Sequence, residues 1–190
     1  MKISILALII SLLLIFPNCK SFKKDNEFEL LSKTYQQFSE RQLRFPDSVL
    51  VLYRENCIQK QSTKTYTGNQ LKIVTYVNAD CGRCVNNIKR WEEEIINVID
   101  TNFVKILIFI YTDDFSKFTN SMYPEISINY PLLIDTLNLF IINNDLPRFD
   151  ERFQTFLIDE NNAIILIGSP LYNRKMRALY MNEINKRIGS

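Results

Sequence analysis

The chain has 190 residues, of which 46% are apolar and 23% are charged, which is the composition of one ordinary globular domain with an extension and excludes a second large domain. Its 23 basic and 21 acidic residues give a net charge of +2 without a long basic run, which excludes the electrostatic footprint of a nucleic-acid-binding protein. The sequence contains no histidine, which excludes Ser-His-Asp hydrolysis, Cys-His proteolysis and H-E-x-x-H zinc chemistry. Thiols, carboxylates and lysines remain as reactive groups.

The N-terminus has the pattern of an export signal. A lysine followed by an apolar run over residues 3–16 predicts a signal peptide over residues 1–18, because the run is shorter than the roughly 20 residues that span a bilayer. Cys19 follows directly and resembles the lipid-modified first residue of bacterial lipoproteins. We therefore expect a lipid on Cys19, a tether over residues 19–27, and a location in the bacterial cell envelope, anchored to a membrane and facing the periplasm.

Two alternatives to the lipid anchor stay open. The signal peptide is cleaved in the ordinary way and Cys19 is incidental, or the apolar run is retained as an uncleaved anchor. Both alternatives place the domain outside the cytoplasm, where disulfides form and persist.

The first part of the domain, which we expect over residues 28–190, has a weak pattern. Apolar residues at helical spacing predict a short helix over residues 28–38, and an apolar run predicts a strand over residues 49–53. Residues 59–70 are polar and contain Gly-Asn, so they predict a loop or an irregular hairpin.

The middle of the chain has a clearer pattern of secondary structure. β-Branched and aromatic residues over 72–77 predict a buried parallel strand, and a short turn leads from it to Cys81-Gly82-Arg83-Cys84. Residues 85–100 predict an amphipathic helix, and residues 103–111 predict a second apolar strand with a short helix beyond it. Two such strands around one helix form a parallel βαβ unit with a right-handed crossover.

The last third of the chain continues with shorter elements. Residues 130–135 predict a short strand and residues 137–142 a short helix. Two apolar strands around a polar turn predict a β-hairpin over residues 155–168, and an amphipathic helix over residues 173–188 follows. We expect the larger aromatic side chains of the strands and the main helix to fill the core: Trp91, Phe103, Phe109, Tyr111 and Phe156.

This order of elements, with C-x-x-C at the start of the first crossover helix and a hairpin before the last helix, resembles the thioredoxin superfamily. More narrowly, it is similar to membrane-anchored thiol-disulfide oxidoreductases of bacterial envelopes and to redoxin-like lipoproteins of the Bacteroidota. Residues 77–84, 130–135 and 155–159 carry the resemblance most specifically. It implies an α/β fold, a thioredoxin-like three-layer sandwich. Its central mixed sheet combines the parallel βαβ unit with a C-terminal antiparallel hairpin and is flanked by helices.

The chain departs from the family pattern at two places. Family members usually have a tryptophan before the first cysteine and a proline between the two, where this chain has Asp80 and Arg83. They also have a cis-proline that faces the cysteines. The best-aligned position here is Phe153, followed by Gln154 and Thr155. We assign these five residues to tuning the thiol pKa or to positioning the substrate.

Disulfide exchange requires a thiolate as nucleophile. We expect Cys81 at the N-terminus of a helix, where free N–H groups and the positive end of the dipole favour the anion. Arg83 acts in the same direction and Asp80 opposes it, while Gly82, which we place in the same tuning or positioning group, lets the turn form tightly. We expect Cys84, one helical turn later, to be more buried and to resolve the mixed disulfide on Cys81.

The sequence therefore predicts an envelope-anchored thiol-disulfide oxidoreductase. It exchanges or reduces disulfides in exported proteins or peptides, with a membrane electron donor as its second partner. The alternatives are an inert structural disulfide or two buried thiols at Cys81 and Cys84, in a non-enzymatic lipoprotein that serves as a binding or assembly module. A thiol peroxidase is a third reading, although residues 78–80 lack the threonine that such enzymes generally have.

The remaining cysteine in the mature chain is Cys57. We interpret it as a small buried apolar residue, with a third redox thiol as the alternative. A metal site of Cys57, Cys81, Cys84 and a carboxylate would lack the second C-x-x-C or the histidine pair that zinc usually takes, so we expect no metal and no cofactor.

Overall fold

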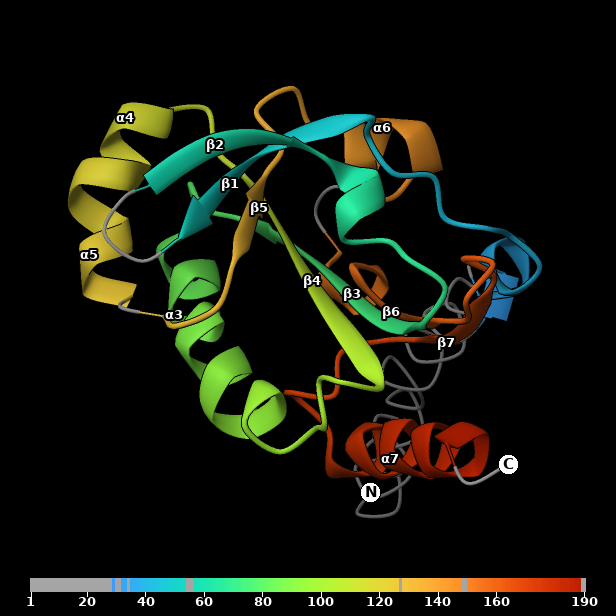
Figure 1. Cartoon of the computed structure of the whole chain (residues 1–190). Coiled ribbons are helices and arrows are strands. Elements are labelled where there is room, and N and C mark those ends of the chain that lie inside the picture. Colours follow the sequence, from blue (N-terminus) through green and yellow to red (C-terminus); the bar gives the residue numbers. More distant parts are fainter. Residues whose placement is uncertain are drawn as a thin grey trace, which may run out of the picture. The chain divides into compact units, whose positions relative to one another are not determined.

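Within the described part of the chain, seven strands form one mixed sheet with the order β2-β1-β5-β4-β3-β6-β7 (Figure 1). The chain divides into two units, Met1–Phe38 and Ser39–Ser190, and the sheet belongs to the second. The predicted signal peptide (1–18) and tether (19–27), with Cys19, lie outside the described residues. The structure, a computed structural model, describes residues 29, 32–33, 35–53, 57–126, 128–147 and 150–188, without the side chains of Cys57 and Cys84.

In the first unit, the described residues are helical, in agreement with the predicted helix over residues 28–38. Lys33 and Glu29 form an exposed i,i+4 ion pair of 2.7 Å on this helix. Nowhere in the described ranges does a helix reach the length and apolarity needed to cross a membrane.

The centre of the sheet is the predicted βαβ unit. β3 (Leu71–Asn78) pairs in parallel with β4 (Val104–Tyr111) along its whole length. On its other side β3 pairs antiparallel with β6 (Thr155–Ile158), which forms the predicted hairpin with β7 (Ile164–Ile167). The first seven residues of β3 are buried because they have neighbours on both edges and both faces, which explains why they are mostly apolar. Lys72 and Thr75 are the buried polar exceptions.

The other half of the sheet differs from the sequence prediction at its edge. β5 (Leu132–Ile134) is parallel to β4, and β1 (Ser48–Tyr53) is antiparallel to β5, as the apolar runs indicate. β2 (Cys57–Ser62) takes part of the segment predicted as a loop or irregular hairpin, so the hairpin alternative holds. This edge strand is polar and its side chains are largely exposed, so it has no apolar alternation to reveal it.

Helices cover both faces of the sheet. α3 follows β3, and a short π-helical segment extends it. A further run of short helices follows β4, and the last helix ends the described chain. The helical elements are η2 (Thr63–Thr65), α3 (Gly82–Trp91), η3 (Glu92–Ile96), α4 (Phe115–Lys117), η4 (Phe118–Met122), α5 (Tyr123–Ile126), α6 (Leu139–Asn144), η5 (Glu151–Phe153) and α7 (Arg174–Ile188).

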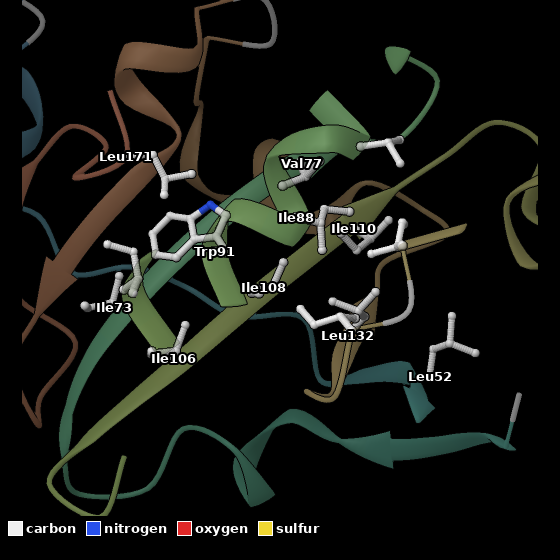
Figure 2. Packing of buried hydrophobic residues seen from close by; sticks show 14 of the residues in the cluster. Leu52, Ile73, Val77, Ile88, Trp91, Ile106, Ile108, Ile110, Leu132 and Leu171 are labelled. Carbon is white, nitrogen blue, oxygen red and sulfur yellow. The ribbon is translucent and has the colours of Figure 1, made fainter. Parts of the chain in front are cut away.

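The main core lies between the sheet and the layer of α3, α5 and α7. Figure 2 shows Trp91 and Ile88 of α3 packed over β3 and β4, with Leu171 beside the indole. Trp91 is 2% exposed, and burying a side chain of this size contributes roughly 3 kcal/mol or more to folding. On the opposite face, Phe109 of β4 stacks on Phe140 of α6 with 4.7 Å between ring centroids. These two packed faces confirm the predicted three-layer α/β architecture.

Two predicted core residues are not buried. Tyr111, the last residue of β4, is partly exposed, and Phe103 lies outside the core. Phe103 is 53% exposed, because it precedes β4 in the turn and not in the strand. Trp91, Phe109 and Phe156 are buried as predicted.

Candidate active site

Cys81 stands where β3 ends and α3 begins, as the sequence predicts. It is the N-cap residue of α3: its backbone is extended, with φ −95° and ψ 109°, and its carbonyl oxygen accepts a hydrogen bond of 3.2 Å from the Val85 N–H. Its side chain makes no capping hydrogen bond, so the helix end acts on the sulfur through its dipole. The residue is partly exposed.

Cys84 lies in the first turn of α3, three positions after Cys81. Its side chain is outside the described residues, so its role as resolving thiol stays a prediction.

Asp80 joins the loop that carries Cys81 to the end of the neighbouring strand. Its carboxylate accepts a hydrogen bond of 2.7 Å from the Thr112 hydroxyl. The Asp113 N–H donates to the same carboxylate, at 3.0 and 3.2 Å from its two oxygens. We call these three residues the Asp80 latch. The Ala79 N–H adds a backbone hydrogen bond of 2.8 Å to the Tyr111 carbonyl, so the loop before Cys81 is held against β4 at two successive residues.

Sequence reasoning missed Thr112 and Asp113. Their position in the sequence could have indicated them, because they directly follow β4. The carboxyl ends of adjacent parallel strands lie at the same edge of a sheet, so residues after β4 lie near residues after β3. Their hydrogen bonds give Asp80 a positioning role that the sequence did not show.

Gly82 and Arg83 are both exposed. A methyl group added at Gly82 would meet no atom within 4 Å outside its own helical turn, and its φ is not in the left-handed region. The expectation that glycine is needed for a tight turn is therefore wrong. Arg83 has no hydrogen bond or ion pair with any described residue, so its guanidinium is a solvent-exposed charge in the first turn of α3.

The structure brings Phe153, Gln154 and Thr155 to the C-terminal end of β3, near which Cys81 stands. The Gln154 carbonyl accepts a hydrogen bond of 2.8 Å from the Tyr76 N–H, and the hydroxyls of Thr155 and Thr75 lie 2.9 Å apart. All three side chains are buried and no described peptide bond is cis. Burial means that they shape this end of the sheet and offer little surface to a substrate.

A small polar cavity separates this segment from α3. Its volume is about 30 Å³, which is room for roughly one water molecule. Tyr172 stands at its wall: its hydroxyl donates to a Glu151 carboxylate oxygen at 3.2 Å and accepts from the Asn87 side-chain amide. The Arg90 guanidinium lies 5.8 Å from the centroid of the Tyr172 ring. The cavity is too small for a disulfide substrate, and Cys81 is not among its lining residues.

An ion-pair network holds the C-terminal end of α3, the helix that Cys81 caps. Arg90 of α3 donates to the Glu94 carboxylate at 2.7 Å, and Arg177 of α7 donates to its other oxygen. These hydrogen bonds, those from Arg90 first, lower the pKa of Glu94 below its ordinary value of 4.5. The network ties α3 to α7.

Cys57 is the first residue of β2, and three strands separate β2 from β3 in the sheet. The backbone topology therefore places Cys57 on an edge strand, whereas the strand that leads to Cys81 lies inside the sheet. Whether it is a buried apolar residue or a redox thiol stays a prediction. The described residues contain no group of three or more cysteines, aspartates or glutamates placed to hold a metal ion.

Comparison with known proteins finds likeness in structure alone. No protein-family model and no curated protein matches the sequence. A protein assigned as a disulfide isomerase from Bacteroides thetaiotaomicron has 16% identity and a TM-score of 0.51, over 80% of this chain and 92% of that one. A protein assigned as thiol:disulfide interchange protein DsbE from Chlorobium tepidum has 10% identity and a TM-score of 0.53, over 77% and 99%.

The reduced 2-Cys peroxiredoxin of Plasmodium vivax matches with 14% identity and a TM-score of 0.56, over 80% of this chain and 85% of that one. At these identities the likeness concerns the fold alone. These matches agree with the predicted α/β fold, a mixed sheet flanked by helices.

Proposed function

We propose that this protein, which has a thioredoxin-like fold, is a thiol-disulfide oxidoreductase of the bacterial cell envelope. The observation that carries the proposal is the position of Cys81. A partly exposed cysteine caps a ten-residue helix directly after the central strand of the sheet. A thiolate at a helix N-terminus is favoured by the dipole, and an accessible thiolate is the reactive species in disulfide exchange.

The reaction takes two exchange steps. The Cys81 thiolate attacks one sulfur of a partner disulfide, so a Cys81–partner S–S bond forms while the partner bond breaks and its second sulfur leaves as a thiolate. The Cys84 thiolate then attacks the Cys81 sulfur, which releases the partner as a dithiol. Two electrons pass to the partner and leave a Cys81–Cys84 disulfide, which a dithiol donor at the membrane reduces again.

We expect the substrate to be an exported polypeptide, because Cys81 is partly exposed and exported proteins are those in which disulfides form and persist. The Asp80 latch keeps the Cys81 loop in one position against β4 during this encounter.

The proposal includes export and a lipid on Cys19, which follow from the sequence pattern of residues 1–19. An envelope location supplies both partners that the reaction needs, exported proteins with disulfides and a membrane electron donor.

Trapping tests the proposal. In a Cys84→Ser variant the second step is blocked, so mixed disulfides through Cys81 accumulate in cells and resolve on a non-reducing gel as adducts that thiol reductants remove. The matched control is the Cys81→Ser, Cys84→Ser double variant, which forms none. An absence of adducts in the single variant, or equal adducts in both, contradicts the proposal and leaves the binding-module alternative. Consumption of peroxide by the reduced protein would instead favour the peroxidase.

A further inference from the structure

A second hollow lies at the other end of the sheet from Cys81. It has a volume of about 320 Å³, within the range of small-molecule sites, and its lining includes the start of β4 and the segment that leads into β5. β3 and β4 are parallel, so the start of β4 and the cysteine after β3 stand at opposite ends of the sheet. We call this hollow the tyrosine hollow, after Tyr53, Tyr66 and Tyr130 in its wall.

Two hydrogen-bond donors in the tyrosine hollow have no acceptor among the described residues. The ammonium group of Lys105 has no ion pair or hydrogen bond with any residue that the structure describes. The Tyr130 hydroxyl accepts a hydrogen bond of 3.3 Å from the Ile106 N–H, so its own proton remains to be donated, and none of the described residues accepts it. None of the described residues that line the hollow has a carboxylate. A positive charge and an oriented hydroxyl are a donor set for an anion.

The walls of the hollow suit a flat ring. Tyr53, Tyr66 and Tyr130 all line the hollow, and Tyr53 is 49% exposed. Burial, and after it the neighbouring Tyr53 phenol, raises the pKa of both Tyr66 and Tyr130, so these phenols stay protonated in the physiological range. The Tyr66 hydroxyl donates to the Gln61 side chain, which holds its ring in place. Leu107 and Leu133 add apolar lining.

From this arrangement we propose that the tyrosine hollow binds a small aromatic carboxylate, with the ring among the tyrosines and the carboxylate on Lys105 and the Tyr130 hydroxyl. The site is independent of disulfide exchange at Cys81, because it uses other residues at the other end of the sheet.

The test uses the mature chain and two probes of equal shape, 2-naphthoate and its neutral analogue 2-naphthamide. Titration of ¹⁵N-labelled protein is expected to give saturable amide shifts at residues 105–107, 129 and 130. Naphthoate is expected to bind about fivefold more tightly than the amide, the size of a partly exposed charge pair. Lys105→Met is expected to remove this preference, while Lys175→Met on α7, an exposed lysine outside the hollow, keeps it.

Three results would overturn the proposal: no saturable binding of naphthoate, equal binding of the two probes to the unaltered protein, or shifts that fall outside the hollow. An unchanged preference in Lys105→Met would remove the assigned role of the ammonium. The ¹⁵N spectrum of each variant shows directly that it is folded.

Discussion

Replacing Asp80 with alanine tests how the Cys81 loop is held. The change removes the acceptor of the Thr112 hydroxyl at 2.7 Å and of the Asp113 N–H at 3.0 Å. Hydrogen bonds to a charged group contribute about 1.5–3 kcal/mol each, and the low end applies because Asp80 is exposed. Water can replace the carboxylate at the exposed Asp113 but less readily at Thr112, which is 5% exposed. The expected loss is about 2 kcal/mol, or a melting temperature lower by roughly 4–8 °C.

Urea denaturation of Asp80→Ala, Thr112→Val and the double variant measures this loss. Because both single changes break the same hydrogen bond, the double variant is expected to lose about 1 kcal/mol less than the sum of the two. Asp47→Ala is the matched control: Asp47 is exposed and its side chain has no partner among the described residues, so it is expected to cost less than about 0.5 kcal/mol. If Asp80→Ala costs no more than Asp47→Ala, or if the single losses add fully, the latch does not hold the loop.

Three further changes test other parts of the structure. Trp91→Ala is expected to lower the free energy of unfolding by about 3–5 kcal/mol, and a loss below about 1 kcal/mol would contradict its place in the core. Unfolding is followed by circular dichroism, because Trp91 is the sole tryptophan and its removal abolishes the tryptophan fluorescence signal. Gly82→Ala is expected to raise stability by up to about 0.5 kcal/mol, since the added methyl group meets nothing, and a clear loss would show a need for glycine. The pKa of Glu94 is lowered in the folded state, so its contribution is present above pH 4.5 and is lost as the pH falls through the folded value. Glu94→Gln is therefore expected to flatten the fall of the unfolding free energy below pH 4.5, and an unchanged slope would exclude the contribution.

The central βαβ unit and the final hairpin could be predicted because their signals are local. The residues of β3 and β4 are mostly apolar, and α3 has its buried residues at helical spacing, including Ile88 and Trp91. Cys81 stands between two such strong patterns, so its position at the helix start was predictable as well.

The features that the sequence did not show depend on contacts between distant segments. β2 is a polar edge strand, and pairing with β1, not burial, makes it a strand. The Asp80 latch joins residues more than thirty positions apart, and the tyrosine hollow joins the end of β1 to the start of β4. Phe103 has the apolar character of a strand residue but falls in the turn before β4, where local sequence does not separate the two.

The reduction potential of the Cys81–Cys84 pair tests the central claim most directly. It can be measured on the mature chain by equilibration with glutathione buffers, followed by alkylation and mass analysis of the peptide that holds both cysteines. A pair that exchanges disulfides with partners is expected between roughly −120 and −270 mV. A value below about −300 mV would mark a structural disulfide and contradict the proposed function.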